Sequence, residues 1–353
     1  MSVEAAQADR LVRGVGERSV PALARAISLV ENGRDGYEEI LSALHPSVGN
    51  AHRIGITGPP GSGKSTLIER VVRIYRDRDI TVAVVAVDPT SPFTGGALLG
   101  DRIRMESLTL DPGVYIRSMA SRGATGGLAT TTREVCDVLD AFGFERVIIE
   151  TVGVGQSELA IAGSADTTAL VLVPESGDGV QVLKAGVMEI ADLYVINKSD
   201  RPGADRLVQE VEVMLGIRRG NAYRHVGPHH GGLAGRTARR EPDDGAGTAG
   251  WAPPVLKTAA AKGEGTEAAI DAVDRHRAFL ESTGLLQERR RARLAQHTRE
   301  VVNRALSTLV WERWDGEAVL AAGLDDVVSG RLSPYRLARN IVADLQEERG
   351  HGG

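Results

Sequence analysis

The sequence has one cysteine, few aromatic residues and no long apolar run. Cys136 is the only cysteine among 353 residues, so no disulfide forms within a chain and no cluster of thiolates can hold a metal. We expect Cys136 to be a small buried apolar residue. Aromatic residues make up 4% of the chain, and no apolar run approaches the ~20 residues of a membrane-spanning helix. We therefore expect no membrane association.

Lysine is also scarce. Of 42 positively charged residues only five are lysine, at positions 64, 184, 198, 257 and 262. Lysine provides a compact, flexible point charge and arginine a rigid planar fork, so lysine in this chain suggests a local need for a point charge. The net charge of −5 gives no general attraction to nucleic acid, and we expect no such partner. The first 18 residues lack a secretory signal pattern, which predicts a cytoplasmic protein.

The pattern along the chain predicts three regions. Residues 1–50 are expected to form an N-terminal helical arm, with Ser19 as a helix cap and Pro21 in the first turn. Across residues 51–283, short apolar runs alternate with helical stretches, which predicts an α/β domain with a mostly parallel sheet covered by helices on both faces. The expected strands are Ile54–Thr57, Val82–Val87, Val147–Ile149, Ala169–Val173, Leu193–Ile196 and Val255–Leu256, and the expected helices are Ser65–Arg76, Thr131–Ala141, Val180–Glu189 and Ala204–Leu215.

Two segments differ from this alternation. Residues 220–250 are rich in Gly, Arg, His and Pro and predict a mobile loop. The loop contains His225, His229 and His230, for which we favour a solvated tract over a metal site. Residues 284–353 are expected to be a C-terminal helical extension. Its apolar stripe could pack on the sheet domain or on a second subunit, and we favour a homodimer; the stripe comprises Leu294, Val301, Val302, Leu306 and Leu309.

A GxxxxGK[ST] motif follows the first expected strand and precedes a helix. It comprises Gly58, Pro59, Pro60, Gly61, Ser62, Gly63, Lys64, Ser65 and Thr66. Such a loop surrounds phosphates with backbone N–H groups at a helix N-terminus, Lys64 is expected to reach the β- and γ-phosphates, and Ser65 to bind Mg²⁺. The context of strand, loop and helix predicts a P-loop nucleotide site rather than an ordinary glycine-rich turn.

Asn197, Lys198, Ser199 and Asp200 form an NKxD segment at the end of the expected strand Leu193–Ile196. In such a segment the aspartate carboxylate accepts hydrogen bonds from guanine N1–H and the 2-amino group, which adenine does not offer. An adenine base would leave that carboxylate without these partners. The segment therefore predicts a preference for GTP and GDP.

Acidic residues follow two other expected strands. Asp88 follows Val82–Val87, and Glu150 follows Val147–Ile149 with Gly153 three residues further on. Asp101 lies in a glycine-rich stretch. We predict that these three carboxylates hold Mg²⁺ together with Ser65, and that their segments respond to the γ-phosphate.

Taken together, these segments resemble one family, the MeaB/ArgK-like GTPases, over roughly residues 15–345. The resemblance rests on residues 58–66, 87–91, 100–105, 150–158, 174–178 with Lys184, 189–192 and 197–200. It implies a homodimeric GTPase with slow, partner-stimulated hydrolysis. Such proteins dock on an adenosylcobalamin-dependent acyl-CoA mutase, methylmalonyl-CoA mutase being the commonest, and gate cofactor loading by an adenosyltransferase. It also implies switch segments at about 88–105, 150–158 and 174–184, which makes Gln156 and Lys184 further candidates for the response to the γ-phosphate.

The chain departs from the family pattern at one loop. The Ser-Ala pair that normally backs guanine is Ala259-Ala260 here, so we expect its backbone N–H groups to contact the base with less side-chain support. Three other functions stay open at this point. One is an ATP-dependent transport-system kinase, which Asp200 disfavours. Another is a nickel metallochaperone GTPase, which the lone Cys136 disfavours. The third is a nucleotide-binding scaffold without useful turnover.

Overall fold

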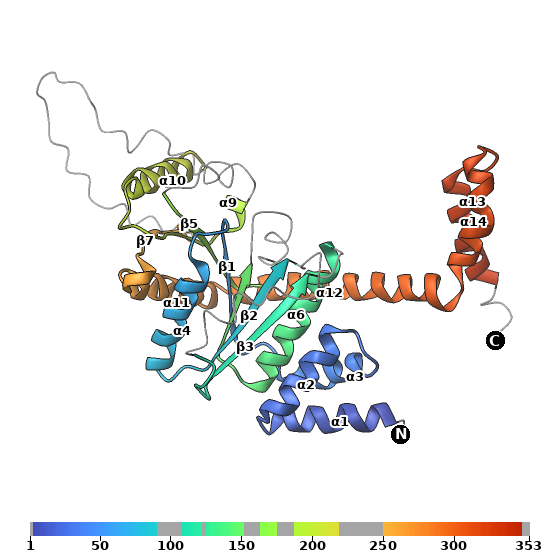
Figure 1. Ribbon diagram of the computed structural model, residues 1–353, viewed down its shortest axis with the longest axis horizontal. Helices are drawn as coiled ribbons and strands as arrows, with labels where there is room; N and C mark the ends of the chain where they lie inside the picture. Colours follow the sequence, from blue (N-terminus) through green and yellow to red (C-terminus); the bar gives the residue numbers. More distant parts are fainter. Residues whose placement is uncertain are drawn as a thin grey trace, which may run out of the picture. The chain divides into compact units, whose positions relative to one another are not determined.

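Among the residues that the computed structural model describes, seven strands form one parallel sheet in the order β3-β2-β4-β1-β5-β6-β7 (Figure 1). The described residues are 3–89, 108–121, 125–151, 163–174, 187–218 and 250–347. The strands are β1 (His52–Thr57), β2 (Val82–Pro89), β3 (Val114–Ser121), β4 (Arg146–Thr151), β5 (Thr167–Leu172), β6 (Leu193–Ile196) and β7 (Val255–Lys257). Because all run in one direction, their carboxyl ends meet at one edge, where α/β sheets place their ligand loops.

The helices connect these strands and extend the chain at both ends. They are α1 (Val3–Gly16), α2 (Val20–Glu31), α3 (Tyr37–Leu44), α4 (Lys64–Asp77), α6 (Thr125–Phe142), α9 (Val187–Ile190), α10 (Ala204–Arg218), α11 (Thr266–Ser282), α12 (Leu285–Thr308), α13 (Gly316–Val328) and α14 (Pro334–Glu347). Short 3₁₀ turns occupy His45–Ser47 and Ala260–Lys262, and a π-helical turn follows α12 at Leu309–Arg313.

Helices cover both faces of the sheet. Along β2 successive side chains alternate between the faces: Ala83 and Val85 belong to the core under α6, whereas Val82 and Val84 belong to the core under α4 and α11. A third apolar cluster lies between α10 and the strands β5 and β6. Strands buried on both faces are expected to be almost continuously apolar. This explains why these strands could be predicted from apolar runs in the sequence.

The N-terminal helices belong to the core beneath α6. Buried residues of α1 and α2, among them Val15, Leu23 and Ile27, share a cluster with β2 and β4. Arg117 of β3 adds an ion pair to Glu31 of α2, with 3.1 Å between Arg117 Nε and Glu31 Oε2. The first three helices therefore complete one side of the sheet domain.

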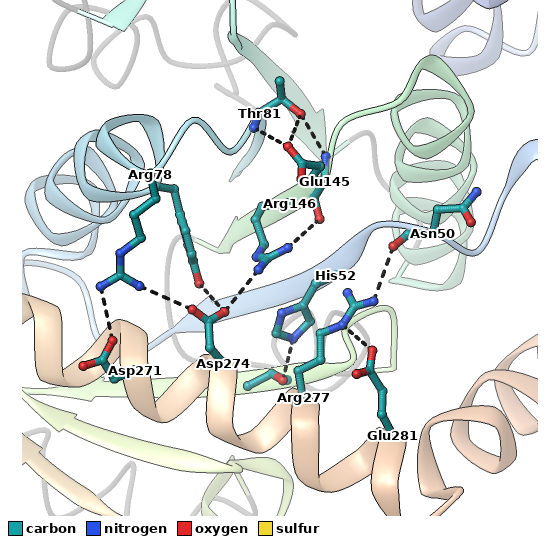
Figure 2. A network of polar contacts seen from close by, with 12 residues as sticks. Asn50, His52, Arg78, Thr81, Glu145, Arg146, Asp271, Asp274, Arg277 and Glu281 are labelled. Atoms are coloured by element: carbon teal, nitrogen blue, oxygen red, sulfur yellow. Dashed lines mark hydrogen bonds and ion pairs between the residues drawn. The ribbon is translucent and has the colours of Figure 1, made fainter.

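A polar network fastens α11 to the amino edge of the sheet. Asp274 of α11 accepts hydrogen bonds from Arg146 of β4 at 3.3 Å and from the Tyr75 hydroxyl at 3.2 Å, and it lies 3.6 Å from Arg78 (Figure 2). Arg277, one turn further along α11, donates to Glu281 and to the carbonyl of Asn50. These contacts brace the end of the sheet opposite the ligand loops.

The chain divides into two compact units, Met1–Arg289 and Arg290–Gly353. The first turn of α12 belongs to the first unit, where Leu286 is buried and Arg289 donates to Asp192 at 3.1 Å. In the second unit α13 packs against α14, burying Leu337 and Ile341. None of the described helices is long and apolar enough to span a membrane.

The expected fold class is confirmed: the sheet is parallel, helices cover both its faces, and the C-terminal region is helical. The sequence pattern did not predict β3, because this strand lies at the sheet edge and interrupts its apolar residues with Arg117, Ser118 and Ser121. Most of the helix expected at 180–189 lies outside the described residues, as does the segment 220–249 with His225, His229 and His230. Cys136 is buried as expected.

Candidate functional site

The loop between β1 and α4 has backbone geometry that only glycine accepts easily. Gly58 has φ of +143°, and a Cβ atom there would lie 2.1 Å from the carbonyl oxygen of Val171 in β5. Gly63 has φ of +84° and precedes the first turn of α4. The glycines of the motif thus let the loop turn tightly against β5 and bring its N–H groups to the start of a helix, the arrangement that binds phosphate anions.

Lys64 lies folded back over this loop. Its side chain is buried, and its ammonium group donates to the carbonyl oxygens of Gly58 at 2.8 Å and Pro59 at 3.1 Å. The charge is therefore held at the centre of the loop, where a β- or γ-phosphate would be expected. Of the remaining motif residues, Ser62 and Ser65 are buried, while Pro60 and Thr66 are exposed.

Two hydrogen bonds link the residues on either side of the loop to the carboxyl end of β4. The Ser65 hydroxyl donates to Glu150 Oε1 at 2.9 Å, and Thr151 donates to Thr57 at 3.0 Å. Ser65 and Glu150 are both nearly inaccessible to solvent. Hydroxyl and carboxylate oxygens are the ligands that Mg²⁺ prefers, so the donors that the structure brings together here fit that ion. Asp88 is the seventh residue of β2, beside β4 in the sheet.

Asn197 joins three segments at the end of β6. Its amide Nδ2 donates to the carbonyl oxygen of Ser62 in the phosphate loop at 2.8 Å. Its Oδ1 accepts from the Thr258 hydroxyl and from the backbone N–H of Ala260, each at 3.1 Å. Because Asn197 is 2% exposed, these bonds are shielded from water. The phosphate loop, the NKxD segment and the Ala259-Ala260 loop are consequently fixed to one another.

The next residues of the NKxD segment make contacts of their own. Lys198 has φ of +55° and donates from its ammonium group to the carbonyl of Gly61 at 2.8 Å. Asp200 Oδ2 lies 3.0 Å from the ammonium group of Lys262. The hydrogen bond from Lys262 lowers the pKa of Asp200 below its ordinary value. Asp200 is therefore ionised at neutral pH, as a carboxylate must be to accept from a purine edge.

The structure brings together many of the residues that the sequence singled out. The phosphate loop, Glu150, Asn197, Lys198, Asp200, Ala259 and Ala260 all lie at the carboxyl edge of the sheet. Four candidates, Asp101, Gly153, Gln156 and Lys184, lie outside the described residues. The metal-binding role expected of Asp101 therefore stays a prediction.

Sequence reasoning missed three residues of this edge. Thr258 bonds to Asn197, Arg70 of α4 donates to the carbonyl oxygens of Ala260 and Ala261 at 3.2 Å, and Lys262 contacts Asp200. The scarcity of lysine was a usable signal, because Lys64, Lys198 and Lys262 all lie at this site. Nothing in the local sequence pointed to Arg70.

A glycine-rich loop between the buried strand β1 and a helix, with an NKxD segment at the end of β6 hydrogen-bonded to it, defines the class of P-loop nucleotide hydrolases. Within this class, known proteins similar to the chain indicate its family. Residues 23–315 match the family described as methylmalonyl-CoA mutase-associated GTPase MeaB. The chain belongs to this family, and it is a GTPase.

Individual relatives agree with the family match. A Pyrococcus abyssi protein named as a GTPase is 41% identical over 342 residues, covering 96% of both chains. The mouse mitochondrial protein named methylmalonic aciduria type A homolog is 40% identical over 206 residues, covering 54% of this chain and 50% of its own. A crystal structure of a protein named LAO/AO transport system kinase is 26% identical, with a TM-score of 0.65 and coverage of 98% of this chain and 99% of that one.

Proposed function

We propose that this GTPase binds GTP and GDP with Mg²⁺ at the carboxyl edge of the sheet, and that Asp200 recognises guanine. The observation that carries the proposal is the position of Asn197, which bonds to the phosphate loop and to the Ala259-Ala260 loop at once. A nucleotide spanning these segments has its phosphates at Lys64 and its base beside Asp200. The fixed geometry means that little ordering is needed when the nucleotide binds.

The residues of the site suggest how hydrolysis is supported. Lys64 and the N–H groups of the phosphate loop would stabilise the negative charge on the phosphates, which is the main requirement of phosphoryl transfer. Ser65 and Glu150, with Asp88 and Asp101 as further candidates, would hold the Mg²⁺ ion, which neutralises phosphate charge when bound. We expect slow intrinsic turnover, because none of the described residues of the site is an evident strong general base.

The proposed partner is an adenosylcobalamin-dependent acyl-CoA mutase, with methylmalonyl-CoA mutase as the first choice. The description of the family names that enzyme, and the mouse relative is named for methylmalonic aciduria. On this proposal the GTPase docks on the mutase, uses the nucleotide state to gate cofactor loading, and works beside a cobalamin adenosyltransferase.

The test is co-purification from the native cell with the full chain as bait, in the presence of a non-hydrolysable GTP analogue, GDP or no nucleotide. We expect a mutase to be retained in a nucleotide-dependent way and to raise the GTPase rate at least about tenfold when added pure. Lys257→Met is a suitable control bait, because this exposed lysine pairs only with Asp205 in the described contacts. Equal recovery under all three conditions, or no change in rate, would contradict the proposed partner.

We also propose that the protein is a homodimer that associates through its C-terminal unit. Large apolar side chains of that unit are exposed in the single chain, including Trp311, Leu324 and Val328 at 42%, 49% and 81%. Large exposed apolar patches commonly mark interfaces, and we infer that these side chains contribute to one. Sedimentation of the full chain should give a dimer mass, and a monomer at micromolar concentration would contradict this proposal.

One alternative has a specific observation in its favour. The solved relative with a TM-score of 0.65 is named as a transport-system kinase, and a kinase would transfer the γ-phosphate to a protein. Incubation with γ-labelled GTP and ATP distinguishes the two functions. The proposed function predicts that GTP is hydrolysed to release free phosphate and that ATP is not. A labelled protein, or turnover of ATP at a comparable rate, would favour the kinase.

A further inference from the structure

The loop that carries Lys262 is held rigidly. It forms the 3₁₀ turn Ala260–Lys262, closed by hydrogen bonds from Lys262 N to Ala259 O at 2.8 Å and from Ala259 N to Glu264 O at 3.0 Å. Gly265 has φ of +73°, and a Cβ atom there would lie 2.1 Å from the carbonyl oxygen of Lys257. Arg70 fixes the outer side of the turn through two carbonyl oxygens. The root of the Lys262 side chain is consequently well defined.

From this fixed root Lys262 reaches the carboxylate of Asp200. The two groups are 3.0 Å apart, although they belong to loops that follow different strands, β6 and β7. Their side chains are 54% and 35% exposed, so the pair adds little to the stability of the fold. The contact raises the pKa of Lys262 and lowers that of Asp200, so it stabilises the charged form of both groups. A pair that contributes little to stability but includes the guanine-recognising carboxylate points to a functional role.

We propose that Lys262 is a positioning residue for guanine recognition, which orients the Asp200 carboxylate toward the base. The inference rests on the proposed guanine role of Asp200. A carboxylate has about four lone-pair sites, so one ammonium group on Oδ2 leaves acceptors for both guanine N1–H and the 2-amino group. Lys262 therefore supports guanine binding instead of competing with it, because the carboxylate is oriented before the base arrives.

The experiment is calorimetric titration of the full chain with GDP and with inosine diphosphate, which lacks the 2-amino group. Lys262→Met should weaken GDP binding about two- to fivefold, the effect expected of an exposed ion pair. It should weaken the binding of inosine diphosphate less, because hypoxanthine lacks the 2-amino group and donates only N1–H to the Asp200 carboxylate. Lys262→Arg should restore GDP affinity. Lys257→Met is the matched control: it removes a lysine of similar exposure, 53%, which is paired with Asp205 at 2.9 Å, and it should bind both nucleotides as the wild type does.

Three results would overturn the inference. The first is unchanged or tighter GDP binding by Lys262→Met, and the second is an equal loss for both nucleotides with a lowered melting temperature, which indicates a merely structural role. The third is a Lys262→Met effect that persists in the Asp200→Asn background. Failure of the underlying function looks different: Asp200→Asn alone would then bind GDP as tightly as the wild type.

Discussion

At the scale of single residues, the site depends on a few buried polar groups whose partners are other loops. Asn197 is the clearest case, since one buried side chain bonds to the phosphate loop and also to Thr258 and Ala260 in the loop after β7. Lys64 and Glu150 are also buried. Lys64 donates to the carbonyl oxygen of Gly58, and Glu150 accepts from the Ser65 hydroxyl. Buried polar groups of this kind are costly unless they are satisfied, so their placement indicates a preformed site.

Lys64 should be essential for nucleotide binding. Replacing it with alanine removes the only cation bonded to the carbonyls of Gly58 and Pro59 within the described part of the chain. We expect Lys64→Ala to lower GTP affinity at least about 100-fold, since hydrogen bonds to charged groups contribute about 1.5–3 kcal/mol each. Fluorescence titration with a labelled guanine nucleotide measures the effect. Lys257→Ala serves as control, and affinity within a few-fold of wild type for Lys64→Ala would refute the assignment.

At the scale of elements, the phosphate loop depends on its close approach to β5. A methyl group at position 58 would overlap the carbonyl of Val171 at 2.1 Å, which is backbone and cannot rotate away. We expect Gly58→Ala to cost about 1–3 kcal/mol of stability and to abolish nucleotide binding, because the loop must move. Gly33→Ala is the control, because Gly33 also has positive φ (+56°) but has open space around it. Thermal melts that show equal losses for both variants would contradict this interpretation.

The sequence predicted the elements whose environment is uniform and missed those that depend on distant neighbours. Strands such as β2 and β5 are buried on both faces, so their apolar runs were recognisable. The edge strand β3 mixes Arg117 and serines with apolar residues and gave no such signal. The phosphate loop and Asn197–Asp200 were predicted because their local spacing reflects their chemistry. Arg70 and Lys262 were missed because their partners lie at least 60 residues away along the chain.

At the scale of the whole molecule, stability should depend on pH through a histidine at the amino edge of the sheet. His52 is fully buried, with Nε2 2.8 Å from the Thr167 hydroxyl (Figure 2). Burial lowers the pKa of His52 well below its ordinary value; Asp166 opposes this shift, and nearby Arg277 and Arg146 add to it. His52 is thus neutral in the folded protein at pH values where the unfolded chain already binds a proton.

We therefore expect the free energy of unfolding to decrease as pH falls below about 6.5, by at most ~1.4 kcal/mol per pH unit from this one proton. Denaturant melts between pH 7.5 and 5.5 measure the slope. His52→Gln, which cannot be protonated, should be less stable at pH 7.5 but should show a flatter dependence. If the variant retained the full wild-type slope, another group would be responsible.

The base preference of Asp200→Asn tests guanine recognition most sharply, and calorimetry with GDP, xanthosine diphosphate (XDP) and ADP in the presence of Mg²⁺ measures it. We expect the wild type to bind GDP and neither of the other two nucleotides. In the variant, the amide NH₂ group would oppose the 2-amino donor of guanine but would donate to the O2 carbonyl of xanthine, so XDP should become the preferred ligand by about 100-fold or more. Unchanged GDP affinity in Asp200→Asn would show that the base is recognised elsewhere, and guanine recognition by Asp200 would be wrong.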